Sequence, residues 1–137
     1  MKLRVFVTLL LMAAVGFAQS PQPAPMRPIP PAGIEIPAQD RAELEAGLKS
    51  LRASIDKLRG NPRLPDVQIY HEAVRYALLY NEFFKPDEIA KAKILLQHGE
   101  ERARLLAEGK APWTTATGLI VRGYVSKIDK SVQPLGG

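Results

Sequence analysis

Three stretches between residues 37 and 109 carry apolar side chains at helical spacing, and proline or glycine bounds each of them. Side chains three and four positions apart share one face of a helix, so the spacing predicts helices at about 37–59, 66–83 and 86–108. Proline suits the first turn of a helix, and glycine suits the position just beyond its end. The sequence therefore predicts a mainly α fold over residues 37–109, either an antiparallel helical hairpin or a three-helix layer.

The three predicted helices differ in the width of their apolar face. The first has a narrow stripe that suits a hairpin partner; it also resembles a dimerising coiled coil, but it spans fewer than four heptads. Its members are Leu44, Leu48, Leu51, Ile55 and Leu58. The second is apolar on most sides, which predicts a central, buried helix with Asp66 as its N-cap. Its tyrosines fit either a core edge or interface, or the lining of a ligand pocket. The third has small residues in its stripe, which lets another helix approach closely: Ala92, Gly99 and Ala103.

The N-terminal segment has the features of an export signal. Residues 1–18 combine the basic Lys2 and Arg4 with an apolar run and small residues before Gln19, which predicts a cleaved signal peptide. An uncleaved N-terminal anchor is the alternative. Residues 19–36 are rich in proline and predict an extended linker; a proline-rich ligand for an aromatic groove is a second interpretation. We therefore expect an exported protein, periplasmic or extracellular, that meets the membrane only through the signal peptide before cleavage.

The pattern changes after residue 109. Residues 110–137 predict a loop followed by an incomplete β-hairpin, with a strand at 118–128 and a turn at 129–131. A two-stranded ribbon is marginally stable alone, and its edges are unpaired. We therefore expect this hairpin to be the truncated start of a larger sheet, so that the chain is the front of a larger protein or a piece that needs a partner.

The residues themselves predict no catalytic, cofactor-binding or metal site. The chain has no cysteine, and none of its serines lies in a G-x-S-x-G motif. His71 and Glu72 begin an H-E-x-x-H pattern, but Arg75 stands where the second zinc ligand would be. His71 and His98 are each interpreted as residues at a helix edge or surface. Four charged residues of the third helix are interpreted as a solvated face: Glu100, Glu101, Arg102 and Arg104. Loss of residues 1–18 would lower the net charge from +5 to +3, which is only weak support for a nucleic-acid partner, and we expect none.

Two runs resemble a known group of proteins: LPDVQIYHEAVRYALLYNEFF from Leu64, and GKAPWTTATGLIVRGYVSKIDKSVQP from Gly109. They are similar to the region that precedes the catalytic domain in secreted bacterial α/β-hydrolases, of the prolyl oligopeptidase or esterase-like type found in acidobacteria and planctomycetes. The resemblance covers roughly residues 31–134, and its most specific part is R-G-Y-x-S-x-I-D-x-S-x-Q-P at 122–134. The chain departs from the pattern of this group at two places. Lys130 stands where a turn glycine is expected, and residues 135–137 replace the expected strand that begins with an aromatic residue.

The resemblance implies that residues 118–134 form the first hairpin of an α/β-hydrolase sheet. It implies a parent serine hydrolase, a peptidase or esterase, whose catalytic residues have no counterpart in these 137 residues. On this basis the chain is expected to be a non-catalytic helical portion that packs on a catalytic domain and shapes access to it. The alternative is a stand-alone exported helical protein that acts through another protein chain.

Overall fold

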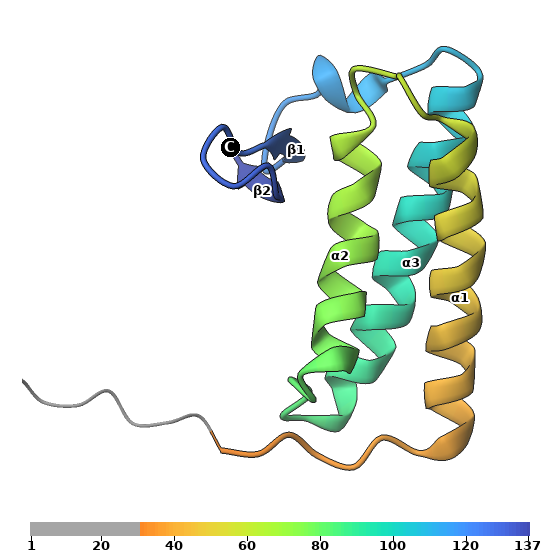
Figure 1. Ribbon diagram of the computed structural model, residues 1–137, viewed down its shortest axis with the longest axis vertical. Coiled ribbons are helices and arrows are strands. Elements are labelled where there is room, and N and C mark those ends of the chain that lie inside the picture. Colours follow the sequence, from red (N-terminus) through yellow and green to blue (C-terminus); the bar gives the residue numbers. More distant parts are fainter. Residues whose placement is uncertain (1–30) are drawn as a thin grey trace, which may run out of the picture. The chain divides into compact units, whose positions relative to one another are not determined.

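The computed structural model describes residues 31–137, which form three long helices and a small antiparallel sheet (Figure 1). In chain order the elements are α1 (Ala38–Lys57), α2 (Pro65–Leu79), α3 (Pro86–Ala107), a 3₁₀ turn η1 (Pro112–Thr114), β1 (Val121–Val125) and β2 (Val132–Gly136). The mainly helical fold with a C-terminal pair of strands is therefore confirmed. The predicted signal peptide and residues 19–30 of the predicted linker lie outside the described residues. None of the described helices is long and apolar enough to cross a membrane.

Helices α1 and α3 follow their predicted stripes. The stripe of α1 is buried within the chain, with only Leu48 half-buried, so it serves as a packing face for the other helices. All six residues of the predicted α3 stripe are buried: Ile89, Ala92, Leu96, Gly99, Ala103 and Leu106. The start of α3 is fixed by Glu88, whose carboxylate accepts hydrogen bonds from the backbone N–H groups of Phe84 and Lys85.

Small residues allow the three helices to pack closely. A Cβ atom on Gly99 would lie 2.6 Å from Leu51 of α1 and 3.0 Å from the Cβ of Tyr70 in α2. Gly99 therefore marks the place where all three helices meet, as the small residues in the α3 stripe predicted. Gly47 in α1 makes a similar approach to Leu96 in α3, at 2.8 Å.

Helix α2 differs from its prediction at both ends. It begins at Pro65, with Leu64 at the N-cap position and no side-chain cap, so the predicted capping role of Asp66 is wrong. It ends at Leu79 rather than at residue 83, because Asn81 adopts a left-handed backbone with φ of 54° that breaks the helix. The second half of α2 also exposes Tyr76, Leu79 and Tyr80, so the helix is buried on most sides only in its first half.

Residues 31–36 were predicted as linker, but they pack against the helical body. The backbone N–H of Ile34 donates to the carbonyl oxygen of Phe83, at 2.6 Å. Gly33 lies so close to Asn81 that a Cβ atom would be 1.8 Å from its carbonyl oxygen. Ile36 is buried in the core. The folded body therefore begins before α1, at the loop that joins α2 to α3.

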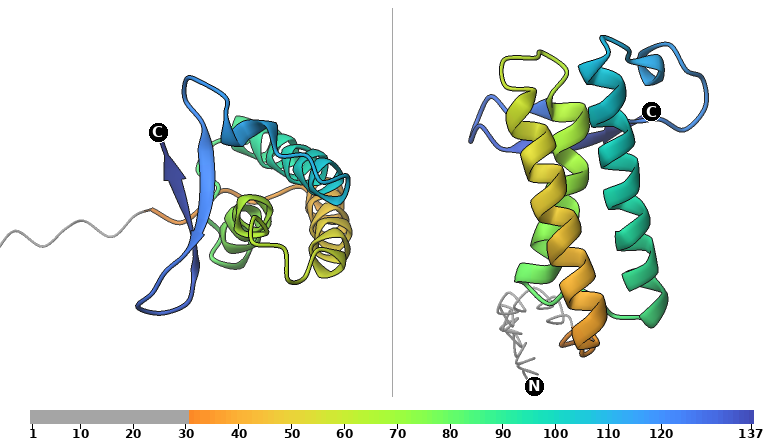
Figure 2. Two further views of the ribbon diagram at one scale, coloured as in Figure 1. Left: turned by 90° about the horizontal axis from the view of Figure 1, so that it is seen from above. Right: turned by 90° about the vertical axis from the view of Figure 1, so that its right-hand side faces the viewer.

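The two strands form an antiparallel hairpin in which Gly123 pairs with Pro134 and Val125 with Val132. The first strand is shorter than the predicted 118–128. Lys130 in the turn has a left-handed backbone with φ of 62°, a conformation that glycine adopts without strain. Viewed from above in Figure 2, the hairpin lies beside α2 on the side away from α1, with β1 nearer the helices and β2 outside it.

Candidate interaction surface

One buried carboxylate connects the helical body to the hairpin. Asp66, in the first turn of α2, is only 2% exposed. Its side chain accepts hydrogen bonds from the indole N–H of Trp113 at 2.9 Å, from Nε of Arg122 at 3.1 Å and from the backbone N–H of Gly123 at 2.7 Å. We call Asp66 and these three donors the Asp66 cluster. It joins α2, η1 and β1 through a single side chain.

The negative charge of Asp66 and the lack of a side chain on Gly123 both help the Asp66 cluster to hold the hairpin. Burial alone raises the pKa of Asp66, but the hydrogen bonds from Gly123, Trp113 and Arg122, together with the Arg122 charge, outweigh it and bring the pKa below its usual value. A Cβ atom on Gly123 would lie 2.0 Å from the carbonyl oxygen of Pro65. Only glycine therefore allows β1 to approach the start of α2 this closely.

Arg102 of α3 also contacts the Asp66 cluster. Its guanidinium donates to the backbone carbonyl of Asp66 at 3.1 Å and lies over the rings of Tyr70 and Trp113, about 5 Å from each centroid. The interpretation of Arg102 as part of a solvated face is therefore wrong. Because every donor of the cluster is directed at Asp66, we assign the cluster a structural role in fixing the hairpin.

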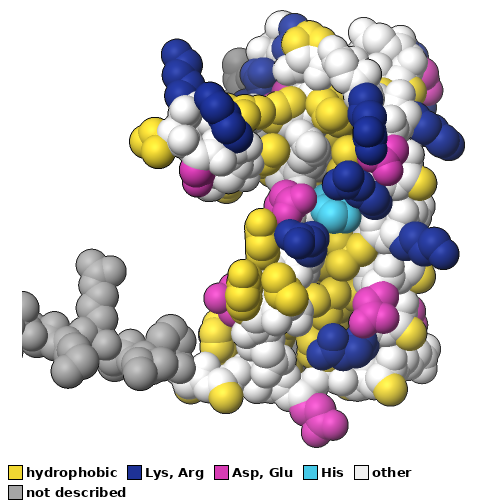
Figure 3. Space-filling view, viewed as in Figure 1, with side chains coloured by type: hydrophobic (Ala, Val, Ile, Leu, Met, Phe, Trp, Pro, Cys, Tyr) yellow, Lys and Arg dark blue, Asp and Glu magenta, His cyan; other side chains and the backbone are white. Residues whose placement is uncertain are grey.

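An apolar groove lies between the hairpin and the helices. It encloses about 290 Å³ and is lined by Ile69, Tyr70, Ala73, Ile94, Leu95, His98, Val121 and Pro134. In Figure 3 the surface is hollowed beside the hairpin, and hydrophobic side chains continue from this hollow down the face formed by α2 and α3. Ile94 is 49% exposed and Leu95 37% exposed, which are large values for aliphatic side chains. The groove therefore presents apolar surface to its surroundings.

Exposed aromatic residues extend the groove along α2. Tyr76 and Tyr80 continue the helical stripe of Ile69 and Ala73, because they follow at spacings of three and four residues. Their rings stack with centroids 5.9 Å apart. Phe84 and Leu79 are exposed at the same end of the helix. The apolar surface thus runs along α2 from the hairpin to the α2–α3 loop.

The hairpin and the loop before it carry further exposed apolar side chains. Leu119 and Ile128 are almost fully exposed, and Tyr124 and Leu135 are about half exposed. Tyr124 and Leu135 are diagonal neighbours on one face of the sheet, and Gly123 belongs to the other face. Large exposed apolar patches on soluble proteins mark sites of interaction with other proteins or membranes. The groove, the aromatic end of α2 and the hairpin together form the candidate interaction surface.

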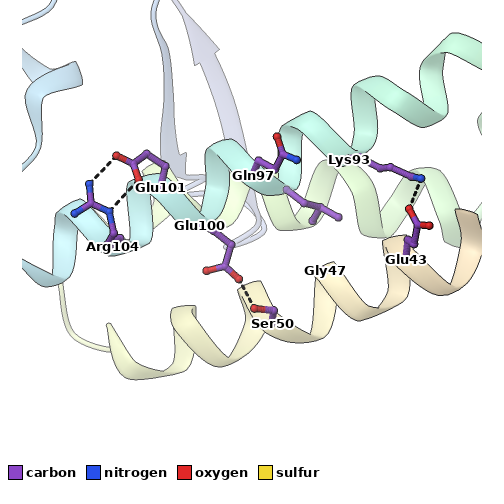
Figure 4. A pocket seen from close by; sticks show the side chains of 9 residues that line it. Glu43, Gly47, Ser50, Lys93, Gln97, Glu100, Glu101 and Arg104 are labelled. Carbon is purple, nitrogen blue, oxygen red and sulfur yellow. Dashed lines mark hydrogen bonds and ion pairs between the residues drawn. The ribbon is translucent and has the colours of Figure 1, made fainter.

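A larger depression of about 700 Å³ lies between α1 and α3, but its charged groups are paired (Figure 4). Lys93 binds both Asp40 and Glu43, and these bonds raise its pKa. Glu100 accepts hydrogen bonds from Ser50 at 2.6 Å and from Ser54 at 2.8 Å, so it too is not simply part of a solvated face. The depression is an open crevice between two helices, and its charged side chains are bound to neighbouring side chains.

The histidines do not form a reactive centre. His71 is 7% exposed and therefore buried rather than at a helix edge, and its nearest charged group is Glu72, 3.4 Å from Nδ1. His98 stacks on Tyr70 in the apolar groove, with ring centroids 6.3 Å apart. Across residues 31–137, acidic residues and histidines form no group that could hold a metal ion. The Asp66 cluster was not predicted from the sequence; its only local signals are an acidic residue in an apolar helix and the single tryptophan of the chain.

Comparisons of the chain with models of protein families, with curated proteins and with solved structures found no significant match.

Proposed function

We propose that this chain is the non-catalytic helical portion of a secreted serine hydrolase of the prolyl oligopeptidase or esterase type, and that it packs on the catalytic domain and shapes access to it. The observation that carries the proposal is the candidate interaction surface. It comprises an apolar groove, exposed aromatic side chains on α2 and exposed apolar side chains on the hairpin, and water is a poor solvent for such surfaces. A covering protein surface would bury it.

Two further features support the proposal. The Asp66 cluster holds the hairpin in a fixed position on α2, as a docking element requires. The hairpin also contains the sequence run at 122–134 through which the chain resembles hydrolases. The features of residues 1–18 support export, and we include it in the proposal.

The second candidate is a stand-alone exported helical protein that acts by binding another protein. The same surface favours it, since an apolar groove with a tyrosine-rich border suits a protein partner of any class. The two candidates differ in the partner: the first requires a serine hydrolase, joined in the same polypeptide or bound to this chain, and the second does not.

A serine-reactive probe separates the candidates. Cells that make the protein are cross-linked and treated with a biotinylated fluorophosphonate, and the chain is then isolated with an antibody against residues 31–137. We expect the isolated material to contain a fluorophosphonate-labelled polypeptide larger than the 15.1 kDa of this chain. Isolation of the chain with no labelled hydrolase would overturn the first candidate and favour the second.

A matched pair of variants tests whether the apolar groove is the contact with the hydrolase. Ile94→Glu places a charge in the apolar groove, and Gln97→Glu places one in the crevice between α1 and α3. If the hydrolase domain is a separate chain, Ile94→Glu should reduce the amount co-isolated at least tenfold, and Gln97→Glu should leave it unchanged. If it is in the same polypeptide, the same comparison is made on the thermal stability of the whole protein. Equal effects of the two variants would argue against the groove as the contact.

A further inference from the structure

The hydrogen-bond pattern of the hairpin shows which backbone groups point outward. Ile120 and Gly137 exchange hydrogen bonds, and the N–H of Ser126 donates to the carbonyl of Ser131. In an antiparallel pair, residues that bond across the ladder alternate with residues whose N–H and C=O point away from it. On β2 the outward positions are therefore Val132, Pro134 and Gly136, which lie between the bonded positions.

The outer edge of β1 is already occupied at its centre. Gly123 is an outward position of β1, and its N–H donates to the Asp66 carboxylate at 2.7 Å. The start of α2 also lies against this strand, because the Pro65 carbonyl oxygen leaves no space for a side chain on Gly123. A further strand therefore has no continuous row of free groups to pair with on this side.

The outer edge of β2 has the opposite character. Among residues 31–137, the outward N–H groups of Val132 and Gly136 and the outward carbonyls of the same strand find no hydrogen-bond partner. Pro134 contributes a carbonyl but no N–H. In Figure 2 the strand lies on the outside of the hairpin, away from the helices. An open strand edge of this kind is a template for another extended chain.

We propose that the outer edge of β2 is extended by a strand of the partner protein, through backbone hydrogen bonds to Val132 and Gly136. This inference rests on the proposed function and specifies its contact: the partner contributes a strand to the hairpin, and it does so at β2 and not at β1. The occupant is a strand because a row of unpaired backbone groups at strand spacing is matched by another extended backbone. Pro134 has no N–H, so β2 offers outward donors only at Val132 and Gly136, four residues apart. This spacing restricts the register in which another strand can pair with β2.

Amide hydrogen exchange tests the proposal on the chain in its native form, isolated under the conditions described above. In the purified chain alone, the amides of Val132 and Gly136 should exchange freely, while those of Gln133 and Leu135 are protected by β1. In the native assembly, Val132 and Gly136 should exchange at least tenfold more slowly. Unchanged exchange at both amides in the native form would overturn the proposal.

The same measurement separates this inference from the proposed function. Slow exchange with a labelled hydrolase present supports both. Slow exchange without a hydrolase supports strand addition and overturns the hydrolase proposal. Fast exchange with the hydrolase present leaves the hydrolase proposal standing and overturns strand addition. Fast exchange in a chain without a hydrolase overturns both.

A pair of substitutions at one position provides the control. Gly136→Pro removes the outward N–H without removing a hydrogen bond to β1, and Gly136→Ala keeps the N–H; a Cβ atom there meets no other atom within 4 Å. If the partner is a separate chain, Gly136→Pro should weaken its binding about tenfold relative to Gly136→Ala, as expected for one lost backbone hydrogen bond. If it lies in the same polypeptide, the exchange rate of Val132 is compared between the two variants and should rise about tenfold in Gly136→Pro. Equal behaviour of the two variants would contradict the proposal.

Discussion

Replacement of Asp66 by asparagine tests the central connection in this fold. The substitution keeps the shape of the side chain but removes its charge and replaces one acceptor oxygen with an NH₂ group. An amide oxygen that still accepts from Gly123 also accepts from Arg122, but the indole N–H of Trp113, which donates to the other carboxylate oxygen, then faces a donor. Trp113 is buried, so its N–H cannot turn to water. Arg122 is 37% exposed and can recover much of its hydration.

The magnitude follows from these environments. A buried donor left without an acceptor costs about 1–3 kcal/mol, and loss of a charge-assisted bond from a partly exposed cation adds about 1 kcal/mol or less. We therefore expect Asp66→Asn to lower the free energy of unfolding by about 2–3 kcal/mol. That is a large part of the 5–15 kcal/mol that is typical of whole domains.

The assay is urea unfolding of the purified chain, followed by circular dichroism and by fluorescence of its single tryptophan. The fluorescence reports directly on the Asp66 cluster, since Trp113 is part of it. Asp87→Asn serves as the control, because Asp87 is exposed and pairs only with Lys91 on the surface of α3, and it should change stability much less. A loss below about 0.5 kcal/mol for Asp66→Asn would refute the reasoning.

The pH dependence gives an independent check. Because the pKa of Asp66 is lowered in the folded state, its ionised form stabilises the protein above the unfolded pKa of about 3.9. This contribution is lost as the pH falls through the lower folded pKa. The difference between the native chain and Asp66→Asn should therefore be constant near neutral pH and shrink below about pH 4. A difference that grew with acidification would contradict the assignment.

Three further substitutions have expected outcomes in the same unfolding assay. Gly123→Ala should cost about 3 kcal/mol because its Cβ atom meets the backbone of α2, whereas Gly136→Ala, in open space, should change stability little; equal losses would argue against the close approach of β1. Lys130→Gly should raise stability by about 0.5 kcal/mol, since relief of the left-handed backbone exceeds the entropy that glycine adds to the unfolded chain; a loss would contradict this. Gly99→Val should cost about 2 kcal/mol by forcing Leu51 aside, and a neutral result would show that the helices can separate without penalty.

The three helices could be predicted because their signals are local. Periodic apolar residues and flanking proline placed α1 and α3 within about two residues of their observed ends. The end of α2 was missed because Tyr80 and Phe83 continue its apolar pattern. The apolar pattern does not show that Asn81 adopts a left-handed backbone conformation. It also does not show that Phe83, although buried, belongs to the loop after α2 and not to the helix.

The Asp66 cluster could not be derived in the same way. Its three donors lie 47 to 57 residues from Asp66 along the chain, so no spacing rule connects them with the carboxylate. From sequence, an acidic residue after proline at the start of a helix fits a capping role, and that role was assigned to Asp66. The tertiary structure uses the carboxylate for the hairpin instead. The packing of residues 31–36 was missed for a similar reason, because it depends on a loop far along the chain.

The use of one carboxylate to hold donors from two segments has a consequence for how the chain opens. Trp113 and Gly123 share the same acceptor, so release of Asp66 frees η1 and β1 together. Residues 112–136 should therefore separate from the helices as one cooperative unit, while α1 to α3 remain packed. The unit stays joined to the end of α3 through residues 108–111, so its return to the packed helices closes only a short loop. We therefore expect the hairpin to separate from the helices under mild denaturation before the helices themselves unfold.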